Sequence, residues 1–241
     1  MNIPTTNPWL KPTLLAIATL AFVIAPALTP PFSGYDPGMF PVRIERPSIQ
    51  PAGYAFAIWG VIYLWLGVHA AFGLLRRRTD PAWDITRIPL TIAVAMGAIW
   101  LAIANFAPLS ATVGIWIMQT TALTAFLRAD PAHDRWLLSA PLAIFAGWLT
   151  AAAAVSLGVV ISGYGLLSDT TSTLLMLALV LTITLIAQSR RPEMPVYGLT
   201  VIWALGGIIA VNWTPNPTVA YAACAGAVIV AASLVLRLFR R

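Results

Sequence analysis

The sequence is short of the residue types that build soluble catalytic and metal sites. Its single cysteine, Cys224, excludes an internal disulfide and a cysteine cluster that binds a metal. The two histidines, His69 and His133, argue against a multi-histidine metal centre or a bis-histidine haem. Charged residues make up 9% of the 241 residues. An average soluble domain has about 25%, so the chain is not an ordinary soluble enzyme.

Hydrophobic residues make up 59% of the chain instead, and the mean hydropathy is +0.84. Runs of these residues, separated by Pro, Gly and Arg, predict eight membrane spans. They lie near 12–29, 53–75, 88–106, 110–127, 137–161, 170–188, 196–213 and 217–238. Because each span must satisfy its own backbone hydrogen bonds in lipid, we expect an all-α, polytopic membrane helix bundle with about eight transmembrane helices.

The charges predict topology. The net charge of +6 comes from arginines that fall in alternate connecting segments, as expected of cytoplasmic loops, so it needs no nucleic-acid partner. These arginines are Arg76, Arg77, Arg78 and Arg87, then Arg128 and Arg135, then Arg190 and Arg191, and at the C-terminus Arg237, Arg240 and Arg241. The intervening segments carry only Arg43 and Arg46. We therefore expect both termini in the cytoplasm and a bacterial inner (plasma) membrane as the location.

Charge is absent from the predicted spans themselves. Of the 22 formal charges only Lys11 touches a span, at its edge. Buried charges usually mark proton relays and ion-coupled transport, so their absence argues against a pump or a proton-coupled antiporter. It also leaves no buried acid–base pair for hydrolysis, so we expect no enzyme and no cofactor. Ala25-Pro26-Ala27 resembles a signal-peptidase site, but we expect an uncleaved first helix.

One short motif occurs twice. Residues 78–84, RTDPAWD, are followed fifty positions later by RADPAHD at 128–134, and both lie in predicted cytoplasmic loops. The repeat indicates either a duplicated hairpin with a shared docking surface, or two similar turns in which Asp-Pro ends one helix and a later Asp caps the next. His69 is either a cofactor ligand or a packing residue, and His133 is expected to be solvated.

The ten tryptophans are the most informative residues. Four fall at span ends, where an aromatic belt is expected: Trp9, Trp83, Trp136 and Trp213. Of the six within spans, Trp59, Trp100 and Trp116 are each six residues from the outer end of a span, which places them about 9 Å deep in the outer leaflet.

Aromatic and polar partners accompany these three. Phe56 and Tyr63 share a helix face with Trp59, Gln119 shares one with Trp116, and Asn105 follows Trp100. Such a cluster suits an apolar, planar ligand, or it only holds helices together. The small residues Gly147, Ala151, Ala154, Gly158 and Ser162 predict close helix approach, as a scaffold or a dimer face.

The segment 46–63, RPSIQPAGYAFAIWGVIY, resembles the TspO/translocator-protein family of tryptophan-rich sensory proteins. The resemblance rests on Pro51, Tyr54, Phe56, Trp59 and Tyr63, and more weakly on two later segments. These run from Trp100 through Asn105 to Pro108 and from Pro141 to Trp148. The resemblance implies a five-helix core at 1–162, followed by three additional helices at 163–241.

Compact members of that family bind porphyrins and sterol-like molecules in a pocket beneath the first loop, often as dimers. The resemblance therefore implies a similar pocket for a tetrapyrrole-like or other hydrophobic ligand, which the protein carries or senses. Together with the amide found above, its predicted lining is Tyr54, Phe56, Trp59, Tyr63, Trp100, Asn105, Trp116, Gln119 and Trp148. The alternative is a non-catalytic accessory or assembly subunit of a larger membrane complex. Besides the ligand and the lipid bilayer, the expected partner is a second copy in a homodimer or a larger membrane complex.

Overall fold

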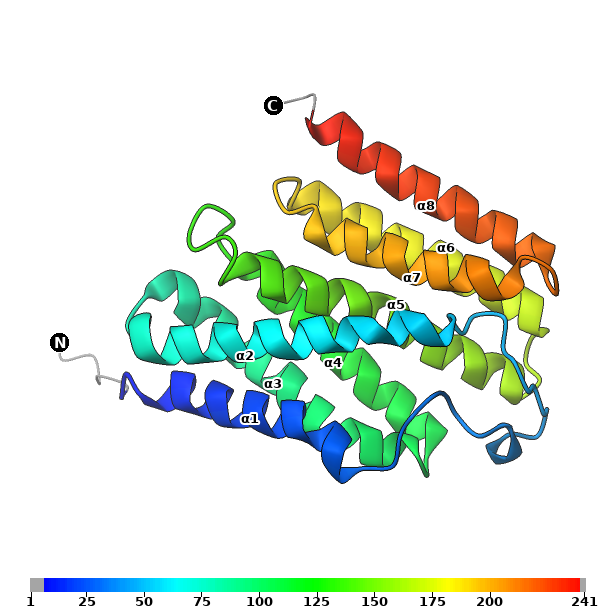
Figure 1. Ribbon diagram of the computed structural model, residues 1–241, viewed down its shortest axis with the longest axis horizontal. Coiled ribbons are helices and arrows are strands. Elements are labelled where there is room, and N and C mark those ends of the chain that lie inside the picture. Colours follow the sequence, from blue (N-terminus) through cyan, green and yellow to red (C-terminus); the bar gives the residue numbers. More distant parts are fainter. Residues whose placement is uncertain (1–6, 239–241) are drawn as a thin grey trace.

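The computed structural model describes residues 7–238, which form a bundle of eight antiparallel α-helices without a β-strand (Figure 1). The helices are α1 (Leu10–Leu28), α2 (Ile58–Arg76), α3 (Pro81–Ala104), α4 (Pro108–Arg128), α5 (Ser139–Gly163), α6 (Asp169–Arg190), α7 (Val196–Asn212) and α8 (Pro217–Leu238). Two short 3₁₀ helices, η1 (Pro37–Met39) and η2 (Gly53–Ala57), lie between α1 and α2. The start of α1 and the end of α8 lie at the same end of the bundle. Arg240 and Arg241 of the predicted basic C-terminus lie outside the described residues.

The prediction of an all-α, polytopic membrane bundle is confirmed. Seven helices are long and apolar enough to cross a membrane, judged by length and composition. The eighth, α7, is apolar but has 17 residues, at the lower limit of about 17–25 for a spanning helix. The chain is an integral membrane protein.

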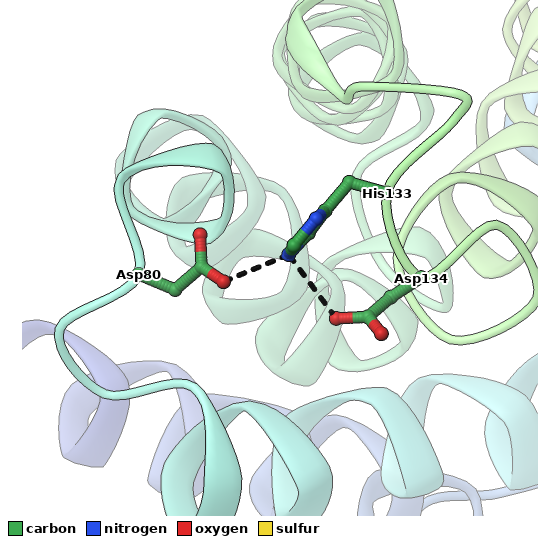
Figure 2. A group of neighbouring side chains, drawn as sticks. All are labelled: Asp80, His133 and Asp134. Atoms are coloured by element: carbon green, nitrogen blue, oxygen red, sulfur yellow. Dashed lines mark hydrogen bonds and ion pairs between the residues drawn. The ribbon is translucent and has the colours of Figure 1, made fainter.

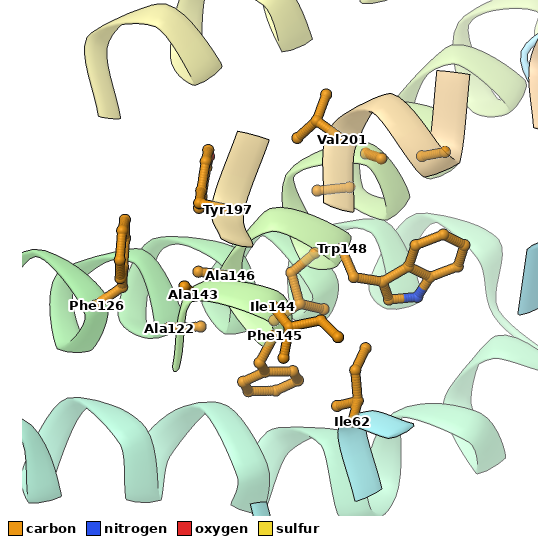
Figure 3. Packing of buried hydrophobic residues seen from close by; sticks show 14 of the residues in the cluster. Ile62, Ala122, Phe126, Ala143, Ile144, Phe145, Ala146, Trp148, Tyr197 and Val201 are labelled. Atoms are coloured by element: carbon orange, nitrogen blue, oxygen red, sulfur yellow. The ribbon is translucent and has the colours of Figure 1, made fainter. Parts of the chain in front are cut away.

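Helix α5 is the centre of the bundle. It contacts α2, α4, α6 and α7, and 21 of its 25 residues are buried. Its side chains interdigitate with those of its neighbours, and Phe126 of α4 stacks on Tyr197 of α7 at 5.2 Å beside it (Figure 3). A Cβ at Gly147 would lie 2.8 Å from the backbone oxygen of Tyr197, and one at Gly158 would lie 3.1 Å from Met176 of α6. The small residues of α5 therefore face other helices of the same chain, which supports the scaffold interpretation over a dimer face.

One predicted boundary was wrong by seven residues. Helix α3 begins at Pro81 instead of near 88, because the Asp80 side chain accepts a hydrogen bond from the Ala82 N–H and Pro81 occupies the first turn. Asp84 and Arg87 are consequently helical. Arg87 is buried and donates to the backbone oxygens of Arg77 and Arg78. The Asp-Pro pair was expected to end the preceding helix, with a later Asp as the cap of the next one, whereas Asp80 itself caps α3 and Pro81 begins it.

Candidate functional site

An apolar cavity of about 250 Å³ lies inside the bundle, beneath the segment 29–52, which we call the first loop. Residues of α1, α2, α3, α4 and α5 form its sides, and Ala204 and Ile208 of α7 add a further wall. We call it the aromatic cavity. Ligand sites of small molecules usually measure about 300–1,000 Å³, so a compact ring system fits this conformation best.

Aromatic rings form one side of the cavity. Trp59 stacks on Tyr63 at 5.3 Å, and the edge of the Trp148 ring system meets Trp59 at 6.1 Å and Phe56 at 5.9 Å. Phe22 of α1 packs edge-on against both Trp59 and Tyr63. Such rings present flat apolar faces and polarised edges, which suit a planar ligand.

Trp100 forms the opposite part of the wall. Its indole N–H donates to the backbone oxygen of Ala111 at 2.7 Å, which fixes α3 against α4. Phe32 of the first loop packs edge-on against the Trp100 ring at 5.1 Å. The first loop thus covers the cavity with an aromatic side chain of its own.

Few polar groups face the cavity, and most of them are already paired. The Tyr35 hydroxyl lies 2.7 Å from Ser156 Oγ, which lies 2.7 Å from Thr112 Oγ1. Burial raises the pKa of the Tyr35 phenol above its ordinary value, so this group stays protonated. The indole N–H of Trp148, by contrast, is buried and has no hydrogen-bond partner among the described residues. A ligand with a hydrogen-bond acceptor would satisfy it.

The structure brings together five of the nine residues predicted to line the pocket. Phe56, Trp59, Tyr63, Trp100 and Trp148 all line the aromatic cavity.

The other four lie elsewhere. Tyr54 is 53% exposed and packs against Trp203 of α7, and Asn105 caps the end of α3 by donating to the Leu101 oxygen. On α4 the lining residues are Ile115 and Met118, each one position before the predicted Trp116 and Gln119. Gln119 instead donates to Thr150 Oγ1 at 3.3 Å.

The sequence did not predict the cavity-lining residues that lie outside the segments resembling the TspO family. Phe22 follows Leu15 and Thr19 on the buried face of α1, a spacing that a search for one apolar stripe would have found. Tyr35 and the α7 residues carry no such signal. They reach the cavity only through the path of the first loop and the packing of α7 on α5.

The first loop is anchored at Ser48 by the C-terminal helices. Both the N–H and the hydroxyl of Ser48 donate to the carboxylate of Asp169, at the start of α6, with the Oγ–Oδ2 distance at 2.5 Å. Asn212 donates to the Ser48 backbone oxygen, and Asn216 donates to Ser48 Oγ. Every polar group of Ser48 is therefore paired with a residue of the C-terminal part of the chain, and loss of the Asp169 carboxylate would leave two of its donors without their acceptor.

Close approach of α7 reinforces this anchor. The Ala52 N–H donates to the Gly207 oxygen, and a Cβ on Gly207 would lie 2.8 Å from Pro51. Trp203 of the same helix donates to the Ala55 oxygen. Helices α6 and α7 and the connection after α7 therefore position the cover of the cavity, and α7 also supplies one wall.

At the opposite end of the bundle, which we call the basic end, the two copies of the repeated motif meet (Figure 2). His133 Nε2 lies 2.8 Å from an Asp80 oxygen and 3.5 Å from Asp134. Arg77 pairs with Asp134 at 2.7 Å and thereby lowers the pKa of that carboxyl. Donor atoms of Asp80, His133 and Asp134 lie within 4.8 Å of one another, as in a metal site, but the Arg77 guanidinium already supplies the positive charge.

At this end the structure corrects the expectations for His133 and Trp83 and decides between the two for His69. His133 is not simply solvated, because it belongs to this ion-pair cluster. Trp83 is not a belt residue, because it is 1% exposed and donates to Asp134 at 2.9 Å. His69 is a packing residue: it stacks on Trp83 at 4.7 Å, and its Nδ1 lies 2.8 Å from the Leu137 oxygen. Since a carbonyl oxygen only accepts, Nδ1 carries the proton.

The two copies of the repeat also form the same kind of turn. Asp130 accepts from the Ala132 N–H, as Asp80 does from Ala82, so both copies form the same Asp-Pro turn. The cluster between them joins the α2–α3 and α4–α5 connections. It is distant from the first loop and stabilises the bundle.

The model of a family described as TSPO-like protein matches residues 9–236, which is nearly the whole chain. No curated protein and no solved structure matches.

Proposed function

The chain belongs to the TSPO-like protein family, and from that membership we propose that it binds a hydrophobic small molecule in the aromatic cavity. The match confirms the family predicted from residues 46–63. The observation that carries the proposal is the cavity itself: aromatic rings form much of its wall, and none of its lining residues is charged. The ligand is a planar or fused ring system of the tetrapyrrole or sterol-like type, and binding serves transport or sensing without catalysis.

The size of the cavity sets a condition on this ligand. A volume of about 250 Å³ holds a compact ring system directly. A tetrapyrrole macrocycle is larger and enters with displacement of the first loop. In this proposal residues 1–162 provide most of the site, while 163–241 supply the α7 wall and the anchor of the loop. The basic end faces the cytoplasm of a bacterial cell, with both termini on that side.

Quenching of intrinsic tryptophan fluorescence tests the proposal. Protoporphyrin dimethyl ester is titrated into the full chain in lipid nanodiscs, and the saturable part of the quenching gives the affinity. Ala152 lines the cavity, so Ala152→Phe fills it. Ala232 is exposed on α8, so Ala232→Phe adds the same ring away from the site and serves as the matched control.

We expect saturable quenching in the wild type and in Ala232→Phe, and its loss in Ala152→Phe. Trp59→Ala removes part of the aromatic wall and should weaken binding about tenfold, as expected for loss of about 1.4 kcal/mol of aromatic contact. Equal quenching in Ala152→Phe and the wild type would contradict binding in this cavity.

A further inference from the structure

A second hollow, of about 520 Å³, lies beside the aromatic cavity at the first-loop end of the bundle. Its wall is formed by the first loop together with Ala104 and Asn105 at the end of α3. Three residues, Gly34, Tyr35 and Gln50, line both spaces. The hollow and the cavity are therefore adjacent, and these residues, which we call the neck, lie between them.

The two spaces have opposite chemistry. No charged residue lines the aromatic cavity, whereas the hollow is lined by the carboxylates of Asp36 and Glu45. Among the described residues that line either space, none is Lys, Arg or His. The hollow is thus a polar space with negative and no positive side chains in its wall.

Neighbouring cations offset this charge only in part. Arg43 pairs with Glu45 at 2.7 Å, but both side chains are largely exposed, so the pair is weak. Arg46 is exposed and does not line the hollow. Asp36 accepts a hydrogen bond from the Gly38 N–H and has no ion-pair partner among the described residues.

The residues at the neck pack closely. Gln50 donates to the Ser33 oxygen at 2.6 Å. Gly34 has a φ of +130°, and a Cβ on it would lie 2.6 Å from the Gln50 side-chain oxygen. Only glycine allows this approach. A molecule that occupies both spaces must pass the neck as a thin linker.

We infer that the ligand is an amphiphile with a ring system in the aromatic cavity, a thin linker at the neck, and a polar head in the hollow that is uncharged or cationic. This inference rests on the proposed function and narrows its substrate class. A carboxylate head would meet Asp36 and Glu45 with no guanidinium or ammonium in the wall of the hollow, so like charges would repel it. An ammonium head would instead be attracted by Asp36 and Glu45.

Three probes that share one ring system and differ in the head test this inference. They are 2-(1-naphthyl)ethylamine, 2-(1-naphthyl)ethanol and 1-naphthaleneacetic acid. Their affinities are measured at pH 7 by isothermal titration calorimetry, on the full chain in nanodiscs of uncharged lipid. The heat remaining in Ala152→Phe measures partition into lipid and is subtracted.

We expect the amine and the alcohol to bind and the acid to bind at least about tenfold more weakly, which corresponds to about 1.4 kcal/mol. The double variant Asp36→Asn, Glu45→Gln should weaken the amine about tenfold and leave the alcohol unchanged. The amide introduced by Asp36→Asn keeps an oxygen that accepts from the Gly38 N–H, so the turn is retained. Glu193→Gln removes one carboxylate at the basic end and should change nothing.

Two results would overturn the inference while leaving the proposed function intact. One is an acid that binds as tightly as the alcohol. The other is an amine whose affinity is the same in the double variant, the Glu193→Gln control and the wild type. If none of the naphthyl probes binds but the porphyrin ester still quenches, the two-space arrangement is wrong and cavity binding stands. If neither class of probe binds, the proposed function itself fails.

Discussion

Replacing Asp169 by Ala should release the first loop from the C-terminal helices. The Asp169 carboxylate accepts hydrogen bonds from both the N–H and the hydroxyl of Ser48. Hydrogen bonds to a charged group contribute about 1.5–3 kcal/mol, and the carboxylate at the start of α6 also interacts favourably with the helix dipole. Asp169 is only partly buried, so water replaces part of these interactions when the carboxylate is removed. We therefore expect Asp169→Ala to lower the free energy of local opening of the first loop by about 2 kcal/mol.

Limited proteolysis measures this opening. Arg43 is exposed in the first loop and is followed by Ile44, so trypsin cleaves there once the segment detaches. Arg46 precedes Pro47 and is a poor site. When opening is fast relative to cleavage, the cleavage rate follows the open population. A loss of about 2 kcal/mol therefore predicts an increase of about thirtyfold in the rate of cleavage after Arg43.

The same digest contains its control. Cleavage after Arg78, at the basic end, should keep its wild-type rate, since the contacts of Asp169 with Ser48 lie at the other end of the bundle. Asp169→Asn retains an acceptor oxygen and should give an intermediate rate. If the rate after Arg43 is unchanged in Asp169→Ala, the Ser48 contacts do not hold the loop, and the argument for its anchoring is refuted.

Two further predictions concern the stability of the bundle. Gly147→Ala places a Cβ 2.8 Å from the Tyr197 oxygen and should destabilise the fold by about 1–3 kcal/mol. Gly206→Ala meets no atom within 4 Å and should be neutral or slightly stabilising; equal thermal unfolding temperatures for the two would contradict this account of α5. The hydrogen bond from Arg77 lowers the pKa of Asp134 in the folded protein. The ionised carboxylate therefore contributes its full share of folding stability above the unfolded pKa of about 4, and this stability is lost as the pH falls through the lower folded pKa. Thermal unfolding at pH 3–6 should therefore show a steeper acid loss of stability in the wild type than in Asp134→Asn, and parallel curves would count against the pair.

Hydrophobic runs were sufficient to predict the helices, because lipid leaves few alternatives for an apolar segment. The hydrophobic runs did not predict the contacts made by residues at the ends of the helices. Trp83 was assigned to a belt from its place near a span boundary, but Asp134, fifty-one residues later, accepts a hydrogen bond from its indole N–H and so keeps it buried. Contacts of that kind follow from tertiary packing and have no local signal.

The residues that line the aromatic cavity were likewise predicted only in part. Phe56 of η2 and Trp59 of α2 line the cavity, because the segment 46–63 places its aromatic rings on one side. On α4 the prediction of Trp116 missed by one position, since Ile115 lines the cavity. One residue corresponds to about 100° of helix rotation, which apolar composition on all sides does not determine.

The anchor at Ser48 has a consequence for biosynthesis. Its partners Asp169 and Asn216 follow it by 121 and 168 residues. Chains are made from the N-terminus at about 5–20 residues per second, so the first helices and their loop exist for some seconds before the residues that hold the loop. During that interval the aromatic rings of α2 have neither a fixed cover nor the α7 wall. Under the proposed function, a ligand in the membrane would meet an open site during this interval, and completion of the chain would close it.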